Sequence, residues 1–236
     1  ENFFSQKFNN ELKYILDNEL SHLSMSESSD QETNDFIYLS EIFMKLFNSK
    51  KLNSLASYFL ESDNIELQHS KLNIKKKEGE GKVTAHQDWP FFPHINFDLI
   101  AIGLYLDGSN INNGGIEYYP KTHKKILNHY KKNTFNYKCE IPNDSKPVMV
   151  DAKPGTIIIH HCLTLHQSRA TKKDKKRRAL IFQYRDIKNK QIGGTIWKCT
   201  GLRSKESKRG NFIKINNKVE RVRNLYDPFQ HYKPDY

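Results

Sequence analysis

The chain has 236 residues, a length that fits one domain with a sizeable hydrophobic core. Its three cysteines show no C-x-x-C spacing, which argues against a disulfide framework or a structural zinc site. No apolar run approaches the ~20 residues of a membrane helix, and no signal peptide is visible. We therefore expect a cytoplasmic protein without membrane partners, and we favour a monomer. Because the chain begins without Met, we also expect some N-terminal sequence to be missing.

The net charge is +11, from 38 Lys and Arg against 27 Asp and Glu. Such an excess would suit nucleic-acid binding, because clustered basic residues bind phosphates. Two lysine clusters stand out, one at positions 71 and 75–77 and one within 172–176. We interpret both as solvated loop charge, and nucleic acid is the less favoured partner. An anionic small-molecule substrate would use the same positive field, and we assign Lys71 to it.

The first part of the chain, residues 1–65, has the apolar spacing of helices. Apolar residues recur at helical intervals within 11–20 and again from Asp35 onward, with Asp35 placed to cap the second helix. A further helix follows Ser49. The polar stretch 24–34 has no apolar period, so the sequence predicts a loop there.

Residues 66–190 change to strand patterns. The run 98–106 is too apolar for a half-exposed strand and is predicted to be central. Further strands are predicted at 116–119, 148–150, 156–160 and 177–185. The total of about eight strands is that of a double-stranded β-helix, the cupin-like jelly roll. We predict a mainly β fold with flanking helices, in a single domain 1–236 with a C-terminal extension at 191–236.

A candidate metal site begins with His86 and Asp88. They are two residues apart, so on an extended strand both side chains leave the same face. A mononuclear non-haem iron site needs one further imidazole, because two histidines and one carboxylate occupy one face of the octahedron and leave three positions open. From the residues alone, His161 and His166 are both candidates for the third ligand. We interpret His160 as a core histidine.

An arginine follows these histidines on a predicted strand. Arg177 opens the run 177–184, which is rich in strand formers. The planar guanidinium binds a carboxylate through two parallel hydrogen bonds, so an arginine beside a metal is the expected partner of a dicarboxylate. Arg178 points to the opposite face of the strand, so only one of the two can serve.

The metal motif and the arginine belong to a longer series of short blocks. The blocks are His86-Gln87-Asp88-Trp89, Phe92-Pro93-His94, Asn113-Gly114-Gly115, Pro120-Lys121-Thr122-His123-Lys124, Pro154-Gly155, His166-Gln167-Ser168 and Arg177-Arg178. In order and spacing the series resembles the phytanoyl-CoA dioxygenase family of iron- and 2-oxoglutarate-dependent oxygenases. The similarity covers residues 66–190.

The resemblance implies a set of cofactors and roles. Iron(II), 2-oxoglutarate and O2 are the implied cofactors, with His86, Asp88 and His166 as the catalytic metal ligands. Arg177 would pair with the distal carboxylate of 2-oxoglutarate, and Ser168 would help to hold it. Asn73 matches an asparagine near the co-substrate in a hydroxylase of this family.

Residues after the metal motif are candidates for the substrate pocket. Trp89 and Phe92 are either pocket walls or core, and His94 is interpreted as pocket lining. The implied activity is hydroxylation of an unactivated C–H bond of a small organic molecule, with release of succinate and CO2. The same cofactors support desaturation or oxidative cyclisation of an amino-acid-derived natural product. Alternatives from other classes are a non-catalytic β-helix protein that binds nucleic acid and a cupin-type hydrolase or isomerase.

Overall fold

The computed structural model describes residues 3–20, 30–75, 81–131, 137–172, 175–193, 202–203, 214–215 and 218–219. Its helices are α1 (Gln6–Tyr14), a π-helical turn (Ile15–Glu19), α2 (Glu41–Phe47), α3 (Lys50–Phe59) and three 3-10 turns (Phe36–Tyr38, Trp89–Phe91 and Thr122–Lys124). Its strands are β1 (Asp30–Asn34), β2 (Ile65–Lys75), β3 (Val83–His86), β4 (Leu99–Tyr105), β5 (Ile116–Tyr118), β6 (His129–Lys131), β7 (Tyr137–Cys139), β8 (Val148–Met149), β9 (Thr156–His161), β10 (His166–Ser168), β11 (Arg177–Asp186), β12 (Lys214–Ile215) and β13 (Lys218–Val219).

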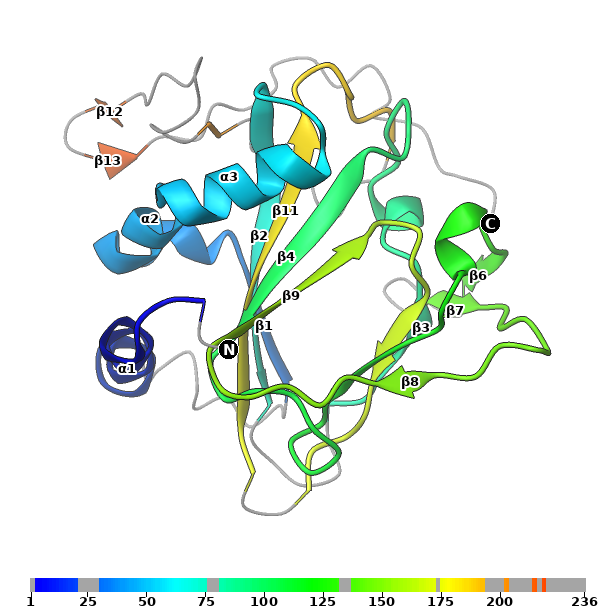
Figure 1. The fold of residues 1–236 in the computed structure, drawn as a ribbon, viewed down its shortest axis with the longest axis horizontal. Coiled ribbons are helices and arrows are strands. Elements are labelled where there is room, and N and C mark those ends of the chain that lie inside the picture. The colour runs from blue at the N-terminus through cyan, green and yellow to red at the C-terminus, as the bar shows by residue number, and fades with distance from the viewer. Residues whose placement is uncertain are drawn as a thin grey trace.

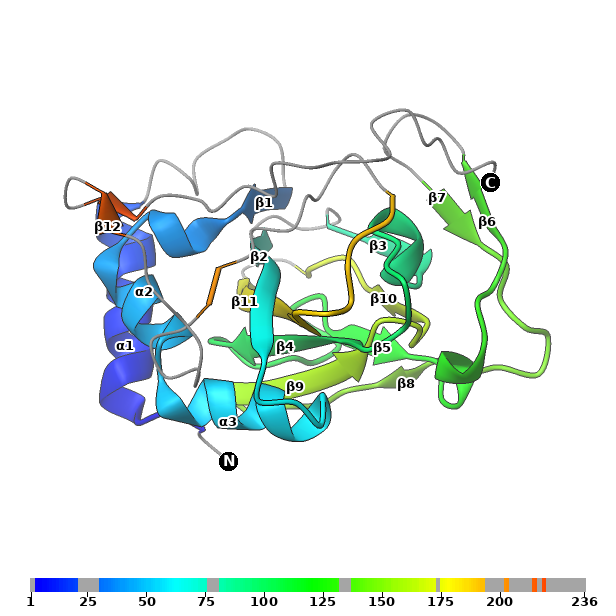
Figure 2. The same cartoon turned by 90° about the horizontal axis from the view of Figure 1, so that it is seen from above.

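Two antiparallel sheets form the body of the protein. The larger sheet has the strand order β1-β2-β11-β4-β9, and the smaller has the order β3-β10-β5-β8. Figure 1 shows the strands of the larger sheet side by side. Figure 2 shows the helices to one side of them and the smaller sheet to the other. Apart from the edge strand β1, each sheet has four strands, which confirms the predicted jelly roll.

Strand β11 decides which side chains face the site, because it lies between β2 and β4 and its side chains alternate. Leu180 and Phe182 point outward and pack with the helices in one hydrophobic cluster. Each such fully buried side chain contributes about 1.5–3 kcal/mol to stability. Arg177, Ile181 and Gln183 point the other way and line a cavity. The helices therefore cover one face of the larger sheet and leave its other face for chemistry.

Serine side chains begin two of the helices. Ser5 Oγ accepts a hydrogen bond from the Phe8 N–H, and Ser49 Oγ accepts one from the Leu52 N–H. The predicted cap at Asp35 is wrong, because this residue has a left-handed φ of 57° and precedes only a 3-10 turn. Helix α2 begins later, after Ser40.

The predicted loop at 24–34 is also wrong in its last part. Asp30–Asn34 forms strand β1, which pairs antiparallel with β2 along the edge of the larger sheet. An edge strand is held by backbone pairing, so its polar sequence carries no apolar signal. Residues 24–29 lie outside the described residues. Within the described ranges, none of the helices has the length and apolar character needed to cross a membrane.

Candidate metal centre

Neighbouring strands of the smaller sheet bring two histidines together. His86 ends β3 and His166 begins β10, and the two are partners in the antiparallel pairing. Their ring centroids lie 4.3 Å apart. Asp88 follows β3 and precedes the 3-10 turn, where its N–H donates to the Cys162 carbonyl at 2.8 Å. This hydrogen bond fixes the backbone of the carboxylate next to the two rings.

The same kind of hydrogen bond orients both rings. Nδ1 of His86 lies 2.8 Å from the carbonyl oxygen of Thr84, and Nδ1 of His166 lies 2.8 Å from that of Thr164. A carbonyl only accepts, so each Nδ1 carries the proton and each Nε2 keeps its lone pair. The lone pairs are directed to one place, because Asp88 Oδ1 lies 3.6 Å from Nε2 of His86 and 3.8 Å from Nε2 of His166.

The protonation states in this cluster suit a metal ion. Burial alone would raise the pKa of Asp88, but the nearby His166, the hydrogen bond from His160 and the nearby His86 lower it well below its usual value. Burial lowers the pKa of His166 well below 6.5, and the nearby His86 adds to this effect. The site therefore offers an ionised carboxylate and a neutral imidazole at neutral pH, which are the forms that bind metals.

A third histidine, His160 on β9, holds the other oxygen of the carboxylate. Its Nε2 lies 3.1 Å from Asp88 Oδ2, and its Nδ1 lies 2.9 Å from the hydroxyl of Tyr118. The interpretation of His160 as an ordinary core histidine is wrong, since it lines the cavity and bonds two side chains. The alternation of side chains along a strand could have indicated this role, because His160 and His161 are adjacent and must face opposite sides of β9.

The middle residue of the metal motif is a second positioning element that the sequence did not reveal. Gln87 is fully buried. Its amide nitrogen donates to the carbonyls of Lys125 at 2.9 Å and Leu163 at 2.6 Å, while its amide oxygen accepts from the Leu127 N–H at 2.8 Å. The Gln87 N–H donates to Nε2 of His129 at 3.0 Å. These bonds fix the chain between the two metal-facing residues.

The cluster lies in a cavity of about 290 Å³. His86, Asp88 and His166 each contribute one ligand atom, and these atoms all lie within 4.8 Å of one another. Among the described residues, other parts of the wall come from both sheets, including Tyr105 of β4 and Ile116 of β5. The cavity therefore runs between the two sheets of the jelly roll.

Arg177 is buried and lines the same cavity. Its Nη1 donates to the carbonyl of Gly114 at 2.8 Å, and its guanidinium lies 5.7 Å from the ring centroid of Tyr105. Gly114 has φ +70°, and a Cβ there would come within 2.7 Å of the Arg169 carbonyl oxygen. Gly114 therefore supports the arginine through its carbonyl, and only glycine fits at this position.

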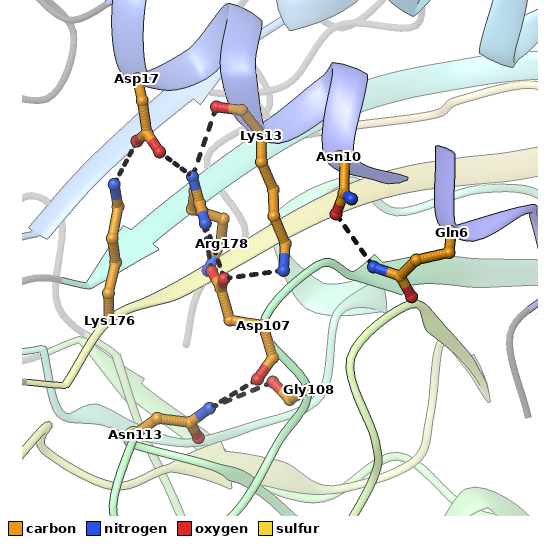
Figure 3. Close-up of polar contacts among 9 residues, drawn as sticks. All are labelled: Gln6, Asn10, Lys13, Asp17, Asp107, Gly108, Asn113, Lys176 and Arg178. Atoms are coloured by element: carbon orange, nitrogen blue, oxygen red, sulfur yellow. Dashed lines mark hydrogen bonds and ion pairs between the residues drawn. The ribbon is translucent and has the colours of Figure 1, made fainter. Parts of the chain in front are cut away.

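Arg178 faces the other side of β11, as the sequence predicts. Its guanidinium bonds both carboxylate oxygens of Asp107, with an Nη2 to Oδ1 distance of 2.7 Å, and reaches Asp17 at 2.7 Å. Figure 3 shows Arg178 between these two carboxylates, beside the segment that carries Lys13. Arg178 therefore ties the N-terminal helical segment to the larger sheet.

The other predicted co-substrate residues, Ser168 and Asn73, also line the cavity. Ser168 Oγ accepts a hydrogen bond from Nζ of Lys75 at 2.8 Å. Lys75 is buried and Lys71 lines the cavity, so the interpretation of this lysine cluster as solvated loop charge is wrong for both. The other lysines of that cluster lie outside the described residues.

Three of the predicted substrate residues do not line the cavity. Trp89 and Phe92 pack in a separate cluster with Leu99 and Leu163. His94 is fully buried, its Nδ1 lies 2.6 Å from the Phe92 carbonyl, and burial lowers its pKa to about 3. Phe91, the last residue of the 3-10 turn after Asp88, lines the cavity instead.

The donor set fits iron(II). Two imidazoles with directed Nε2 atoms and one ionised carboxylate match the facial triad of non-haem iron oxygenases. Both Nδ1–H groups are held by backbone carbonyls and the second carboxylate oxygen is held by His160. Such outer contacts are what fix ligands in metal sites.

The jelly roll and this triad define the class of the protein: a cupin-like oxygenase fold with a mononuclear metal site. A model of the phytanoyl-CoA dioxygenase (PhyH) family matches residues 4–179. The chain belongs to this family, as the sequence motifs predicted. Family membership confirms iron and 2-oxoglutarate as the cofactors expected from the sequence.

Several known proteins are similar. A curated relative from Stutzerimonas stutzeri, named a probable alpha-ketoglutarate-dependent hypophosphite dioxygenase, is 33% identical over 149 residues, which cover 59% of this chain and 51% of the relative. The chain thus spans about half the length of that relative. EctD from S. alaskensis, solved with 2-oxoglutarate and 5-hydroxyectoine, shares the fold with a TM-score of 0.68 at 18% identity, over 94% of this chain and 82% of its own. The epimerase SnoN, solved with Fe3+, alpha ketoglutarate and nogalamycin RO, has a TM-score of 0.66 at 15% identity, over 92% of this chain and 90% of its own.

Proposed function

We propose that the protein is an iron(II)- and 2-oxoglutarate-dependent dioxygenase that hydroxylates a small substrate. The observation that carries the proposal is the matched orientation of His86 and His166. Both give Nδ1–H to a carbonyl two residues earlier and present Nε2 to the same oxygen of Asp88. The buried His94 also has Nδ1 beside a carbonyl two residues earlier, so the feature that distinguishes His86 and His166 is the approach of both Nε2 atoms to one carboxylate oxygen.

The roles of the residues follow from their positions. His86, Asp88 and His166 would hold iron(II). Iron and 2-oxoglutarate, when bound, would supply an oxidant from O2, so that one oxygen atom would go to succinate as CO2 leaves and the other would enter a C–H or P–H bond of the substrate. Arg177 would hold the distal carboxylate of 2-oxoglutarate, because its buried guanidinium lines the same cavity and its orientation is fixed by Gly114.

The size of the cavity supports a small substrate. Ligand pockets commonly measure ~300–1,000 Å³, and this cavity of about 290 Å³ must also hold the co-substrate. An acyl-CoA, the substrate class in the family's name, is too large to be enclosed there. The name of the curated relative supports the same view, because hypophosphite is a small inorganic anion.

Hydroxylation is favoured over halogenation because Asp88 occupies the carboxylate position of the triad and leaves no such position for a halide. Oxidative cyclisation is the second candidate. It is favoured by one neighbour of this fold, the carbocyclase SnoK, which has a TM-score of 0.68 at 14% identity. Product analysis separates the two outcomes, since hydroxylation adds 16 mass units to the substrate and cyclisation removes two (the masses of one oxygen atom and of two hydrogen atoms).

The test is succinate release from 2-oxoglutarate by purified protein with iron(II), O2 and candidate substrates. We expect wild type to release succinate and Asp88→Ala to release none above the protein-free background. Asp98→Ala is the matched control, because Asp98 is an exposed carboxylate outside the cavity wall. Full activity of Asp88→Ala would overturn the ligand assignment.

A further inference from the structure

We propose that the cavity contains a second anion site, formed by Gln183 and Lys71, that binds an oxyanion group of the substrate. This inference rests on the proposed function and specifies the chemical class of the dioxygenase substrate. The ligand would be a small oxyanion, either a carboxylate or a phosphorus oxyanion, and it would be distinct from 2-oxoglutarate.

Gln183 is the buried element of this site. Its side chain is 2% exposed and lines the cavity from the inner face of β11. Among the described residues, its amide nitrogen has no hydrogen-bond partner. Leaving a buried donor unsatisfied costs about 1–3 kcal/mol. A ligand oxygen in the cavity would satisfy this donor, and a carboxylate or phosphorus oxyanion carries acceptors only.

The sheet register places Lys71 beside this amide. Gln183 pairs with His69 on β2 and with Ala101 on β4, while Lys71, two residues along β2, pairs with Ile181. Lys71 also lines the cavity. Because side chains two residues apart on a strand share a face, the ammonium and the amide are on adjacent rows of the cavity wall.

Distance separates this site from the position of the co-substrate. Arg177 and Gln183 share the inner face of β11 but are six residues apart, which is about 20 Å at ~3.3 Å per residue. The five-carbon chain of 2-oxoglutarate spans only ~6 Å, from bonds of about 1.5 Å. Side chains stand roughly perpendicular to a sheet, so one molecule held by Arg177 does not reach Gln183.

The charge of the wall matches an anionic ligand. Among the described lining residues, Lys71, Lys82 and Arg177 are cationic, and Asp88 is the one carboxylate. That carboxylate is contacted by His86, His160 and His166. A small cavity with this lining concentrates anions and disfavours neutral apolar molecules.

The test titrates anions into anaerobic protein that already holds iron(II) and 2-oxoglutarate. Binding is followed by the visible charge-transfer band that iron(II) gives with bound 2-oxoglutarate. The probes are sodium hypophosphite, sodium acetate and acetamide, the neutral counterpart of acetate. We expect at least one anion to shift the band and acetamide to leave it unchanged. A shift caused by hypophosphite but not by acetate would identify phosphorus oxyanions as the ligand class. A shift caused by acetate but not by hypophosphite would identify carboxylates.

Variants then assign the binding. Gln183→Leu should weaken anion binding about tenfold or more, the loss of one hydrogen bond to a charged group. Gln183→Glu should abolish it by charge repulsion, and Lys71→Met should weaken it. All three should still form the 2-oxoglutarate band. Lys153→Met is the matched control, because it removes one positive charge from an exposed lysine outside the cavity wall and should change nothing.

Three results would overturn the proposal. The first is that wild type and Gln183→Leu bind the anion with equal affinity. The second is that acetamide binds as tightly as acetate. The third is that Gln183→Leu loses the 2-oxoglutarate band although its thermal unfolding matches that of wild type. The isosteric Gln183→Met provides a second variant if Gln183→Leu does not fold. Absence of the band in wild type would instead refute the proposed function, and this proposal with it.

Discussion

Removing His160 tests whether the metal site depends on the residues around its ligands. His160 joins the Tyr118 hydroxyl to Asp88 Oδ2, with distances of 2.9 and 3.1 Å. With Oδ2 held, Asp88 has only Oδ1 directed toward Nε2 of His86 and His166. In His160→Ala the carboxylate is free to turn away from the two rings.

The expected loss follows from that one contact. The donor is a ring N–H and the acceptor is a buried, ionised carboxylate, and hydrogen bonds to charged groups contribute about 1.5–3 kcal/mol. Converted to an equilibrium constant, this is a loss of about 10–100-fold in metal affinity, the range typical of such outer partners. Tyr118→Phe should lose less, because it leaves the bond between His160 and Asp88 in place.

The assay is cobalt(II) titration in competition with a chelating dye, which requires no substrate. His161→Ala is the matched control, since His161 is the next residue on the same strand and faces away from Asp88. His160→Gln should recover part of the affinity, because an amide also donates. Wild-type affinity in His160→Ala would refute the reasoning, and a loss far beyond 100-fold would make His160 a ligand itself.

The remaining predictions separate co-substrate binding from stability. Arg177→Ala should raise the 2-oxoglutarate KM about 10–100-fold, the loss of a charge-assisted hydrogen bond, with little effect on metal affinity. Arg178→Ala should leave that KM unchanged and lower the free energy of unfolding by ~2 kcal/mol, measured by urea unfolding; the reverse ranking would exchange their roles. His94 has a folded-state pKa of about 3, below its unfolded value of 6.5. The unfolded state therefore binds the proton first as pH falls, and stability drops between pH 6.5 and about 3, by ~2 kcal/mol at pH 5. Urea unfolding of His94→Gln should lack this part of the acid loss, and an unchanged pH profile would contradict it.

Much of the fold was predictable because strand periodicity is a local property of the sequence. The run that became β4 is apolar throughout because both of its faces are covered. The opposite directions of Arg177 and Arg178 needed only the two-residue repeat of a strand. The pairing of His86 with His166 was implied by family motifs, and no local pattern could have given it, because β3 and β10 are far apart in the chain.

What the sequence did not reveal depends on contacts between distant segments. The polar strand β1 exists because β2 offers it a free edge. Lys75 is buried because the carbonyl of Arg169 and the hydroxyl of Ser168 accept hydrogen bonds from its ammonium group. Phe92 lies outside the cavity wall because it packs against Leu99 and Leu163. None of these depends on the spacing of residue types along the chain.

The most direct test of the central claim is anaerobic addition of iron(II) and then 2-oxoglutarate to the purified protein. Iron(II) with bound 2-oxoglutarate gives a visible charge-transfer band, which free iron(II) lacks. We predict this band in wild type and its loss in His166→Ala, with folding checked by circular dichroism. A wild-type protein that binds iron(II) but gives no band with 2-oxoglutarate would contradict the account and leave a metal site of different chemistry.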